Sequence, residues 1–335
     1  MVEKVDIKEN KIYDLDPIIL NLLLKDNTSK KNIIWATNNY EKRGISYSFD
    51  SQIYDYLITG LNGEVIRPRV RKSKDEQNDR IRNKAEVFTP SWICNCQNNL
   101  VDEAWFGYKD VFNKENEDNT WTTNKNKIKF INDKNWEKYV NELRLEISCG
   151  EAPYLVSRYD TVSGKTIEVG ERIGLLDRKL RIINESVEEE EEWYSWVIRA
   201  YKSIYGFEWQ GDSLLLAREN FLYTFIDNYI FKFNKKPTIE QQKEIAYIIS
   251  WNLWQMDGIK FVIPNSCKNE KVVVAQLNLF GEEEKEKIEC YGCKKNNLKR
   301  HNGIYSKIMN WNTKRTKLFY KLVEEGSKNE KWRCI

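Results

Sequence analysis

The sequence has little histidine and little proline. One histidine, His301, and six prolines occur among 335 residues, no two prolines are adjacent, and none follows Pro264. A single imidazole excludes most Ser–His and Cys–His nucleophilic schemes unless His301 is the base. It also limits the ligands of any metal site to cysteines, carboxylates and one imidazole.

Long apolar runs are absent as well. No stretch of about 18 apolar residues occurs, so the sequence predicts no membrane-spanning segment. The N-terminus is polar with mixed charge and has no signal peptide pattern. The seven cysteines are odd in number and unevenly spread, which argues against a disulfide framework. We therefore expect a cytoplasmic protein.

A large excess of one charge is also missing, because the net charge is only +3. Any nucleic-acid surface must therefore be local. The best candidate is the basic segment 67–84, whose first half, 67–74, has no acidic residue. The predicted contacts to double-stranded DNA are Arg67, Arg69, Arg71 and Lys72. A solvated loop and helix face is the alternative interpretation of this segment.

The chain is long enough for two or three domains. Its mass is 40.0 kDa and 41% of its residues are hydrophobic, as in globular proteins with substantial cores. We expect an N-terminal α/β region over residues 1–80, a core over 81–262 and a small Cys/His-containing, zinc-ribbon-like module over 263–335. Strand and helix patterns alternate along the core, which favours an α/β fold with a mostly parallel sheet and flanking helices.

Local patterns predict the individual elements. Apolar and polar residues alternate over 143–147, which predicts a strand running into a tight turn at Cys149 and Gly150. Two further strands are expected, at 33–37 and 205–208. Helices are expected at 18–24, 90–104, 173–183, 193–204, 215–229 and 237–249.

Two of these helices begin with the pattern of a capping box. Ser186 is followed by Glu189, and Thr238 is followed by Gln241. The first box gives the acidic run 188–192 a structural explanation, since carboxylates near a helix N-terminus favour the helix dipole.

Three unusual segments follow one another along the core. They are residues 88–90 (FTP), residues 145–155 (LEISCGEAPYL) and residues 205–212 (YGFEWQGD). Their order resembles that in the adenine-specific DNA methyltransferases of restriction-modification systems, and more closely that in the bacterial proteins called restriction endonuclease subunit M. The resemblance covers roughly residues 85–262 and implies a Rossmann-like core that binds S-adenosylmethionine.

The resemblance implies roles for the first two segments. Residues 88–90 match the element that lines the S-adenosylmethionine pocket. Residues 146–155 align without gaps to the turn after the first core strand, where a glycine lets backbone amides approach the methionine part of the cofactor. The second glycine of that turn is replaced here by Ala152, which is followed by Pro153. The implied cofactor contacts are Phe88, Thr89, Pro90, Glu146, Cys149 and Gly150.

The third segment implies the contact to the ribose. Glu208 matches the acidic residue that ends the second core strand, and a carboxylate can accept hydrogen bonds from both hydroxyls of a vicinal diol. Residues 212–220 resemble the family helix with its Ala-Arg-x-Asn element. Asp257 is the candidate for the aspartate near the adenine amine, and a surface Asp-Gly turn is the alternative there.

One element of the family is missing. Its catalytic tetrad, (Asn/Asp/Ser)-Pro-Pro-(Tyr/Phe), accepts hydrogen bonds from the target amine and stacks on the flipped base. No Pro-Pro dipeptide exists in this sequence, and the nearest segment, 263–266 (IPNS), has another order and no following aromatic residue. The sequence therefore resembles a cofactor-binding half without its catalytic loop.

These observations lead to three functional hypotheses. The first is an S-adenosylmethionine-binding DNA adenine methyltransferase, or a subunit of one, in restriction-modification or phage defence, with a second methyltransferase or nuclease chain as partner. The second is an inactive methyltransferase-fold protein that binds DNA or a partner, with the C-terminal module as contact surface. The third is a nuclease subunit that uses Glu146, Glu151 and Asp160.

The cysteines of the C-terminal module suggest a metal site. Cys290 and Cys293 form a two-residue-spaced knuckle, Cys267 lies upstream and His301 downstream. Three thiolates and one imidazole would give a closed, structural zinc site, which would supply folding energy to a module with few apolar residues. Free cytosolic thiols are the alternative, and Cys334 is a possible substitute ligand. We expect Cys94 and Cys96 to be core residues.

Overall fold

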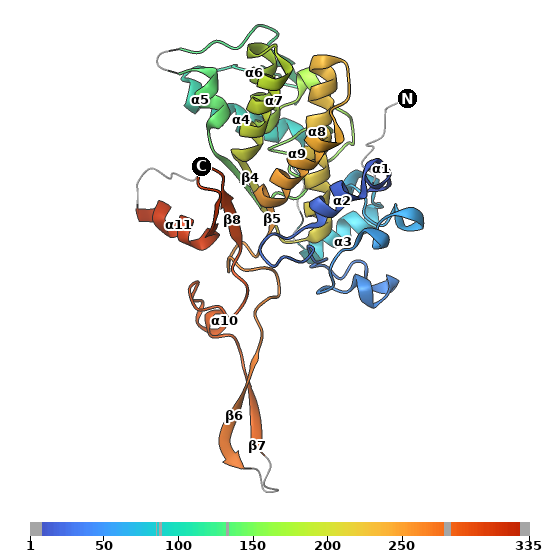
Figure 1. Ribbon diagram of the computed structural model, residues 1–335, viewed down its shortest axis with the longest axis vertical. Coiled ribbons are helices and arrows are strands. Elements are labelled where there is room, and N and C mark those ends of the chain that lie inside the picture. The colour runs from blue at the N-terminus through green and yellow to red at the C-terminus, as the bar shows by residue number, and fades with distance from the viewer. Residues whose placement is uncertain (1–8, 85, 87–88, 132–133, 278–282, 329–335) are drawn as a thin grey trace.

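The computed structural model describes residues 9–84, 86, 89–131, 134–277 and 283–328. It shows a largely helical body around a small sheet and a C-terminal part that extends away from this body (Figure 1). Within the described residues, no helix combines the length and the apolar character needed to cross a bilayer.

The sheet has three parallel strands. They are β3 (Arg144–Ile147), β4 (Ile204–Glu208) and β5 (Leu253–Gln255), in the order β3-β4-β5. The two strands predicted within the core, at 143–147 and 205–208, are thus β3 and β4. The prediction of an α/β fold with a parallel sheet is confirmed at this level.

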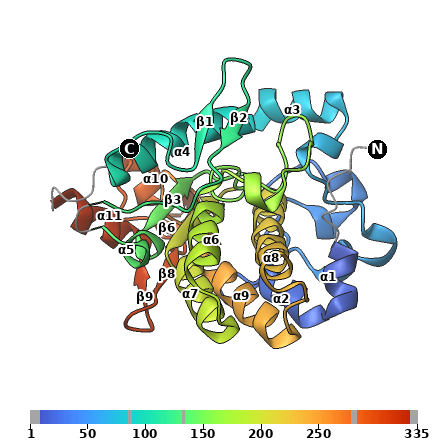
Figure 2. The ribbon, with the colours of Figure 1, turned by 90° about the horizontal axis from the view of Figure 1, so that it is seen from above.

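Four helices cover one face of the sheet and pack side by side (Figure 2). On this face Ile204 and Leu253 join the main apolar core, in which Trp193 and Phe225 are completely buried. The opposite face carries Phe207, which belongs to a second cluster described below. The four helices are α6 (Leu175–Ser186), α7 (Glu190–Lys202), α8 (Gly211–Phe233) and α9 (Ile239–Asn252).

Only one of the two predicted capping boxes forms. At α9, the Thr238 hydroxyl accepts from the Gln241 N–H at 3.2 Å and the Gln241 side chain accepts from the Thr238 N–H at 2.8 Å, as predicted. The prediction of a capping box at Ser186 and Glu189 is wrong. Ser186 is the last residue of α6, and α7 starts after Glu189 without a side-chain cap. Three glutamates in its first turn still favour the dipole of α7.

The N-terminal region contains the helices α1 (Glu9–Leu15), α2 (Pro17–Leu24) and α3 (Lys74–Lys84). Asp16 caps α2, because its carboxylate accepts from the Ile18 N–H at 2.8 Å. The strand predicted at 33–37 does not form as such, since Ile34 makes only an isolated bridge. Short 3-10 helices fill the region, at Glu41–Arg43, Ile45–Tyr47, Asp55–Leu57, Gly60–Asn62 and Arg69–Arg71.

Between α3 and β3 the chain forms α4, a hairpin and α5. Pro90 precedes α4, as expected for a proline at a helix start. Cys94, on α4, is buried as predicted, whereas Cys96 is half-buried and contacts the Glu115 carboxylate at 3.1 Å. The bounds are α4 (Ser91–Phe106), β1 (Asn113–Glu115), β2 (Trp121–Thr123), α5 (Trp136–Asn141) and a 3-10 turn at Val169–Glu171.

The C-terminal part begins with a projecting antiparallel hairpin (Figure 1). The chain after this hairpin returns to the body. There Phe319 packs against Phe207 and Trp254 on the face of the sheet that the four helices leave free. The elements are β6 (Glu270–Leu277), β7 (Glu283–Ile288), α10 (Tyr291–Lys295), β8 (Lys307–Asn310), β9 (Arg315–Leu318) and α11 (Phe319–Lys328).

Two buried carboxyl groups connect α1 to α8. Glu219 is 0% exposed, and neither of its side-chain oxygens has a hydrogen-bond partner among the described residues. Glu9 is 1% exposed. Burial raises the pKa of Glu9 to about 8 and that of Glu219 well above its usual value, and repulsion from the Glu9 carboxylate adds to the shift at Glu219.

This pair predicts that stability falls as pH rises. The unfolded carboxyl groups ionise near pH 4.5 while the folded ones keep their protons, so the free energy of unfolding should decrease between about pH 4.5 and 8, by up to about 1.4 kcal/mol per pH unit and group. Glu219→Gln should flatten this slope in denaturant titrations, and the exposed Glu240→Gln should not. An unchanged slope in Glu219→Gln would show that the pair is not the cause.

Candidate functional site

The four predicted metal ligands come together in the C-terminal module. Cys267 precedes β6, Cys290 and Cys293 belong to the start of α10, and His301 lies in the loop after it. Their ligand atoms all lie within 4.8 Å of one another. The predicted grouping of these four residues is therefore confirmed, although 22 residues separate Cys267 from Cys290.

The distances within this cluster fit a tetrahedral zinc ion. The His301 Nδ1 atom lies 3.6 Å from the Cys267 Sγ, 3.8 Å from the Cys290 Sγ and 3.6 Å from the Cys293 Sγ. Tetrahedral zinc with Zn–S of about 2.3 Å and Zn–N of about 2.0 Å places sulfur and nitrogen about 3.6 Å apart. Three thiolates and one imidazole complete the four positions, which is typical of a structural site.

Two glycines allow the cluster to close. A Cβ at Gly292 would lie 2.6 Å from the backbone nitrogen of His301 and 2.7 Å from its Nδ1. A Cβ at Gly303 would lie 2.8 Å from the Cys267 Sγ. Partial desolvation of the Cys290 thiol is outweighed by hydrogen bonds from backbone N–H groups, including that of Asn302, and its pKa falls to about 6. The thiolate is the form that binds zinc.

The segments implied to bind the cofactor meet at the carboxyl ends of β3 and β4. After β3 the backbone turns sharply, with positive φ at Ser148 (50°), Gly150 (55°) and Ala152 (62°). The Gly150 N–H donates to the Glu208 carboxylate at 2.9 Å, although these residues are 58 positions apart. The turn after the first strand and the acidic end of the second strand are thus in direct contact.

Two carboxyl groups lie at this edge: that of Glu208, which is buried, and that of Glu146, a half-buried residue whose Oε2 atom is buried. Burial raises the pKa of both, and each lies close enough to another carboxylate for repulsion to add to this effect. The N–H groups of Gly150 and Gln210 partly offset the shift at Glu208. The Glu146 Oε2 atom is buried without a hydrogen-bond partner among the described residues. A cationic ligand would stabilise this group of charges.

Thr89 and Pro90 lie beside the loop that follows the turn. The Thr161 hydroxyl donates to the Thr89 carbonyl at 3.0 Å, and the Asp160 carboxylate accepts from the Ser91 N–H at 2.7 Å. The Thr89 carbonyl and the Ser91 N–H therefore contact residues 160–161, which follow the second unusual segment along the chain. Phe88, like Cys334, lies outside the described residues.

Asp257 follows β5, but its carboxylate accepts hydrogen bonds from the backbone of its own turn. The Oδ1 atom accepts from the Ile259 N–H at 2.9 Å and from the Lys260 N–H at 3.0 Å. This is the turn that we named as the alternative. Asp257 also lines a groove of about 400 Å³ together with the cysteine ligands, so the metal cluster lies next to the carboxyl end of β5.

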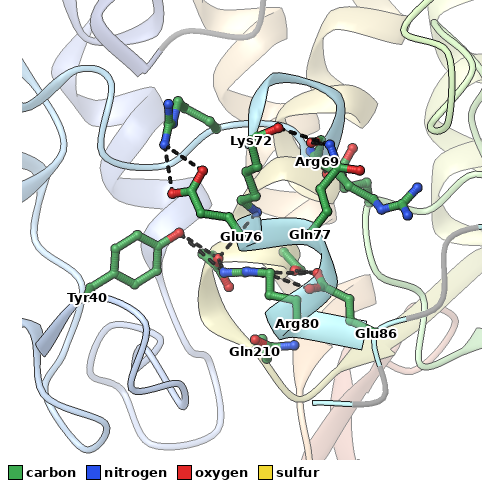
Figure 3. A network of polar contacts seen from close by, with 12 residues as sticks. Tyr40, Arg69, Lys72, Glu76, Gln77, Arg80, Glu86 and Gln210 are labelled. Atoms are coloured by element: carbon green, nitrogen blue, oxygen red, sulfur yellow. Dashed lines mark hydrogen bonds and ion pairs between the residues drawn. The ribbon is translucent and has the colours of Figure 1, made fainter. Parts of the chain in front are cut away.

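The basic segment is largely neutralised by acidic partners (Figure 3). Arg67 pairs with Glu76 at 3.0 Å, and Arg71 pairs with Glu64 at 2.8 Å. Arg69 is not without a partner either, and its backbone N–H donates to a buried carboxylate, that of Glu151, at 2.7 Å.

The fourth predicted DNA contact, Lys72, is buried. It is 8% exposed, and its ammonium group lies 3.8 Å from Asp212 in a network with Arg80 and Tyr40 (Figure 3). Burial lowers the pKa of Lys72. Burial alone would raise the pKa of Asp212, but Arg80 and Lys72 lower it to about 2. In this structure Lys72 faces Asp212 and not the solvent.

Two of the three carboxylates named for a nuclease, those of Glu151 and Asp160, serve other contacts. The Glu151 carboxylate accepts from the Tyr159 hydroxyl at 2.6 Å, and that of Asp160 accepts from the Ser163 N–H at 2.6 Å. In the part of the chain that the structure describes, the group of three cysteines and His301 is the one set of three or more side chains placed to hold a metal ion.

Comparison with known proteins adds no relative. No family model, curated protein or solved structure matches the chain.

Gly292 gives a test of the metal centre. The wild-type protein should contain about one zinc ion per chain, and Gly292→Ala should lose most of it, because the added methyl group would displace the His301 backbone and Nδ1. Gly170→Ala should keep the metal, since nothing lies within 4 Å of a Cβ there. Elemental analysis after gel filtration measures both variants. A wild-type protein that is folded but metal-free would reject the site.

Proposed function

We propose that this protein is the S-adenosylmethionine-binding half of a DNA adenine methyltransferase in restriction-modification or phage defence, with a structural zinc ion in its C-terminal module. The observation that carries the proposal is the contact between Gly150 and Glu208 at the carboxyl edge of parallel strands. In open α/β sheets, ligands bind in the crevice outside the carboxyl ends of the strands.

The charges at this edge suit S-adenosylmethionine, which carries a sulfonium and an ammonium group. Glu146 has a buried oxygen that no described residue hydrogen-bonds, and burial raises the pKa of Glu208. A bound cation would relieve both costs. Glu208 is also the residue that would accept the hydroxyls of the ribose, and the turn at Gly150 would accommodate the methionine part.

Glu146 gives a test that keeps the shape of the site. Glu146→Gln removes the negative charge, so S-adenosylmethionine should bind about 1–3 kcal/mol more weakly in isothermal calorimetry, the scale of a charged hydrogen bond. Glu208→Ala should act in the same direction, and the exposed Glu240→Gln should bind like the wild type. No heat at millimolar ligand with the zinc-loaded wild-type protein would reject the proposal.

The partner chain would lie along β3. This strand is at the edge of the sheet, and Leu145 and Ile147 on it are 47% and 69% exposed. Parallel strands are usually buried on both faces, and Phe207 and Trp254 on the neighbouring strands are covered. The Pro-Pro tetrad that this chain lacks would then enter on a strand added beside β3, next to the proposed cofactor edge.

Ile147 gives a test of this arrangement. The chain should be co-expressed with a neighbouring gene product that carries an Asn-Pro-Pro-Tyr-type tetrad, and the complex measured by gel filtration with light scattering. Ile147→Lys should abolish association, because it places a charge in an apolar interface, while Ile45→Lys, at a site 88% exposed, should not. Methyl transfer to DNA by the chain alone would show that no partner is needed.

A further inference from the structure

The C-terminal module concentrates the positive charge of the protein. Between Cys290 and Val323 the sequence has nine lysines and arginines and no aspartate or glutamate. Because the net charge of the whole chain is +3, the remaining residues carry a net charge of −6 (3 minus 9). All nine basic side chains are exposed. The absence of acidic residues over this stretch is a signal that the sequence alone contains.

Few of these charges are neutralised. Among the described residues, two of the nine have an acidic side chain within 4.0 Å: Lys299 pairs with Glu324 at 2.7 Å, and Lys317 pairs with Glu325 at 3.7 Å. The segment 67–72 differs, because three of its four basic side chains face carboxylates. Of these two basic segments, the one that is open to a polyanion is therefore that of the C-terminal module.

The loop of residues 291–300, which follows the first cysteine of the knuckle and is called the knuckle from here on, presents part of this charge in a defined arrangement. Lys294 and Lys295 are in the last turn of α10. The Arg300 guanidinium lies over the Tyr291 ring, 4.9 Å from its centroid, and this ring is 51% exposed. Exposed aromatic rings and arginines beside lysines are typical of surfaces that follow a nucleic-acid backbone. The metal ligands Cys290, Cys293 and His301 would hold this loop rigidly.

We propose that the knuckle, residues 291–300, is a DNA-binding surface that contacts the phosphodiester backbone of double-stranded DNA. The identity of the ligand rests on the proposed function. The groove that joins Asp257, at the end of β5, to the metal-binding cysteines places the knuckle close to the carboxyl edge of the sheet. DNA held by the knuckle would lie near the proposed cofactor site.

The test uses the zinc-loaded full chain and a fluorescent DNA duplex of arbitrary sequence in an anisotropy titration. The triple variant Lys294→Gln, Lys295→Gln, Arg300→Gln should bind at least about 10-fold more weakly at low salt. Its plot of log affinity against log salt should be shallower by about 1 for each lost phosphate contact. The double variant Lys42→Gln, Arg43→Gln removes an exposed basic pair from the body and should bind like the wild type.

Four outcomes would overturn the inference. These are wild-type affinity in the triple variant, equal losses in the triple and the control variant, tighter binding to single-stranded RNA than to the duplex, and binding to anionic phosphatidylserine vesicles without binding to DNA. The zinc content of the triple variant should equal that of the wild type, which shows that the knuckle is still folded.

Calorimetry with S-adenosylmethionine separates this inference from the proposed function. If the triple variant loses DNA but the wild type binds no cofactor, the knuckle is a DNA-binding surface and the methyltransferase proposal fails. If the cofactor binds and the triple variant keeps its DNA affinity, the proposed function stands and the inference fails.

Discussion

A parallel sheet has to be covered on both faces, because its strands carry apolar side chains on each side. The four helices α6 to α9 cover one face of the three strands. On the other face only the part around Phe207 and Trp254 is covered, by Phe319 from the C-terminal part of the chain. This requirement explains why the C-terminal part of the chain returns to the sheet. The edge strand β3 stays uncovered on this face, and we propose this strand as the position of a second chain.

In its described residues, the C-terminal part lacks a large apolar core of its own. It has few buried apolar residues, among them Met309 and Phe319, and most of its surface is charged or polar. The cysteine and histidine cluster could hold a metal ion there, and four metal–ligand bonds would fix a loop that burial alone would leave unstable. Since Cys267 and Cys290 lie on either side of the β6–β7 hairpin, the same cluster closes the base of this projection.

Buried charged groups in the N-terminal region are paired with groups of opposite charge. Arg80 contacts Asp212 and Glu86, Lys72 lies beside Asp212, and Tyr40 donates to the same carboxylate. Removing one member of such a network leaves another charge uncompensated, which is usually costly. The network holds the N-terminal region against the start of α8, directly after the strand that carries Glu208. Salt bridges between segments that are distant in the sequence thus stabilise the region next to the proposed cofactor edge.

The sequence by itself determined those features whose signal is local or carried by side-chain chemistry. The alternation over 143–147 and the Thr238 box led to β3 and to the start of α9, because period and capping need only neighbouring residues. The ligand set around His301 followed from residue type. Tertiary structure alone decided which charges are free: Lys72 and Asp212 are 140 positions apart, and no local pattern records their contact. It also decided that Ser186 ends α6, and that the exposed basic surface lies on the knuckle, since burial depends on what the whole chain packs against each residue.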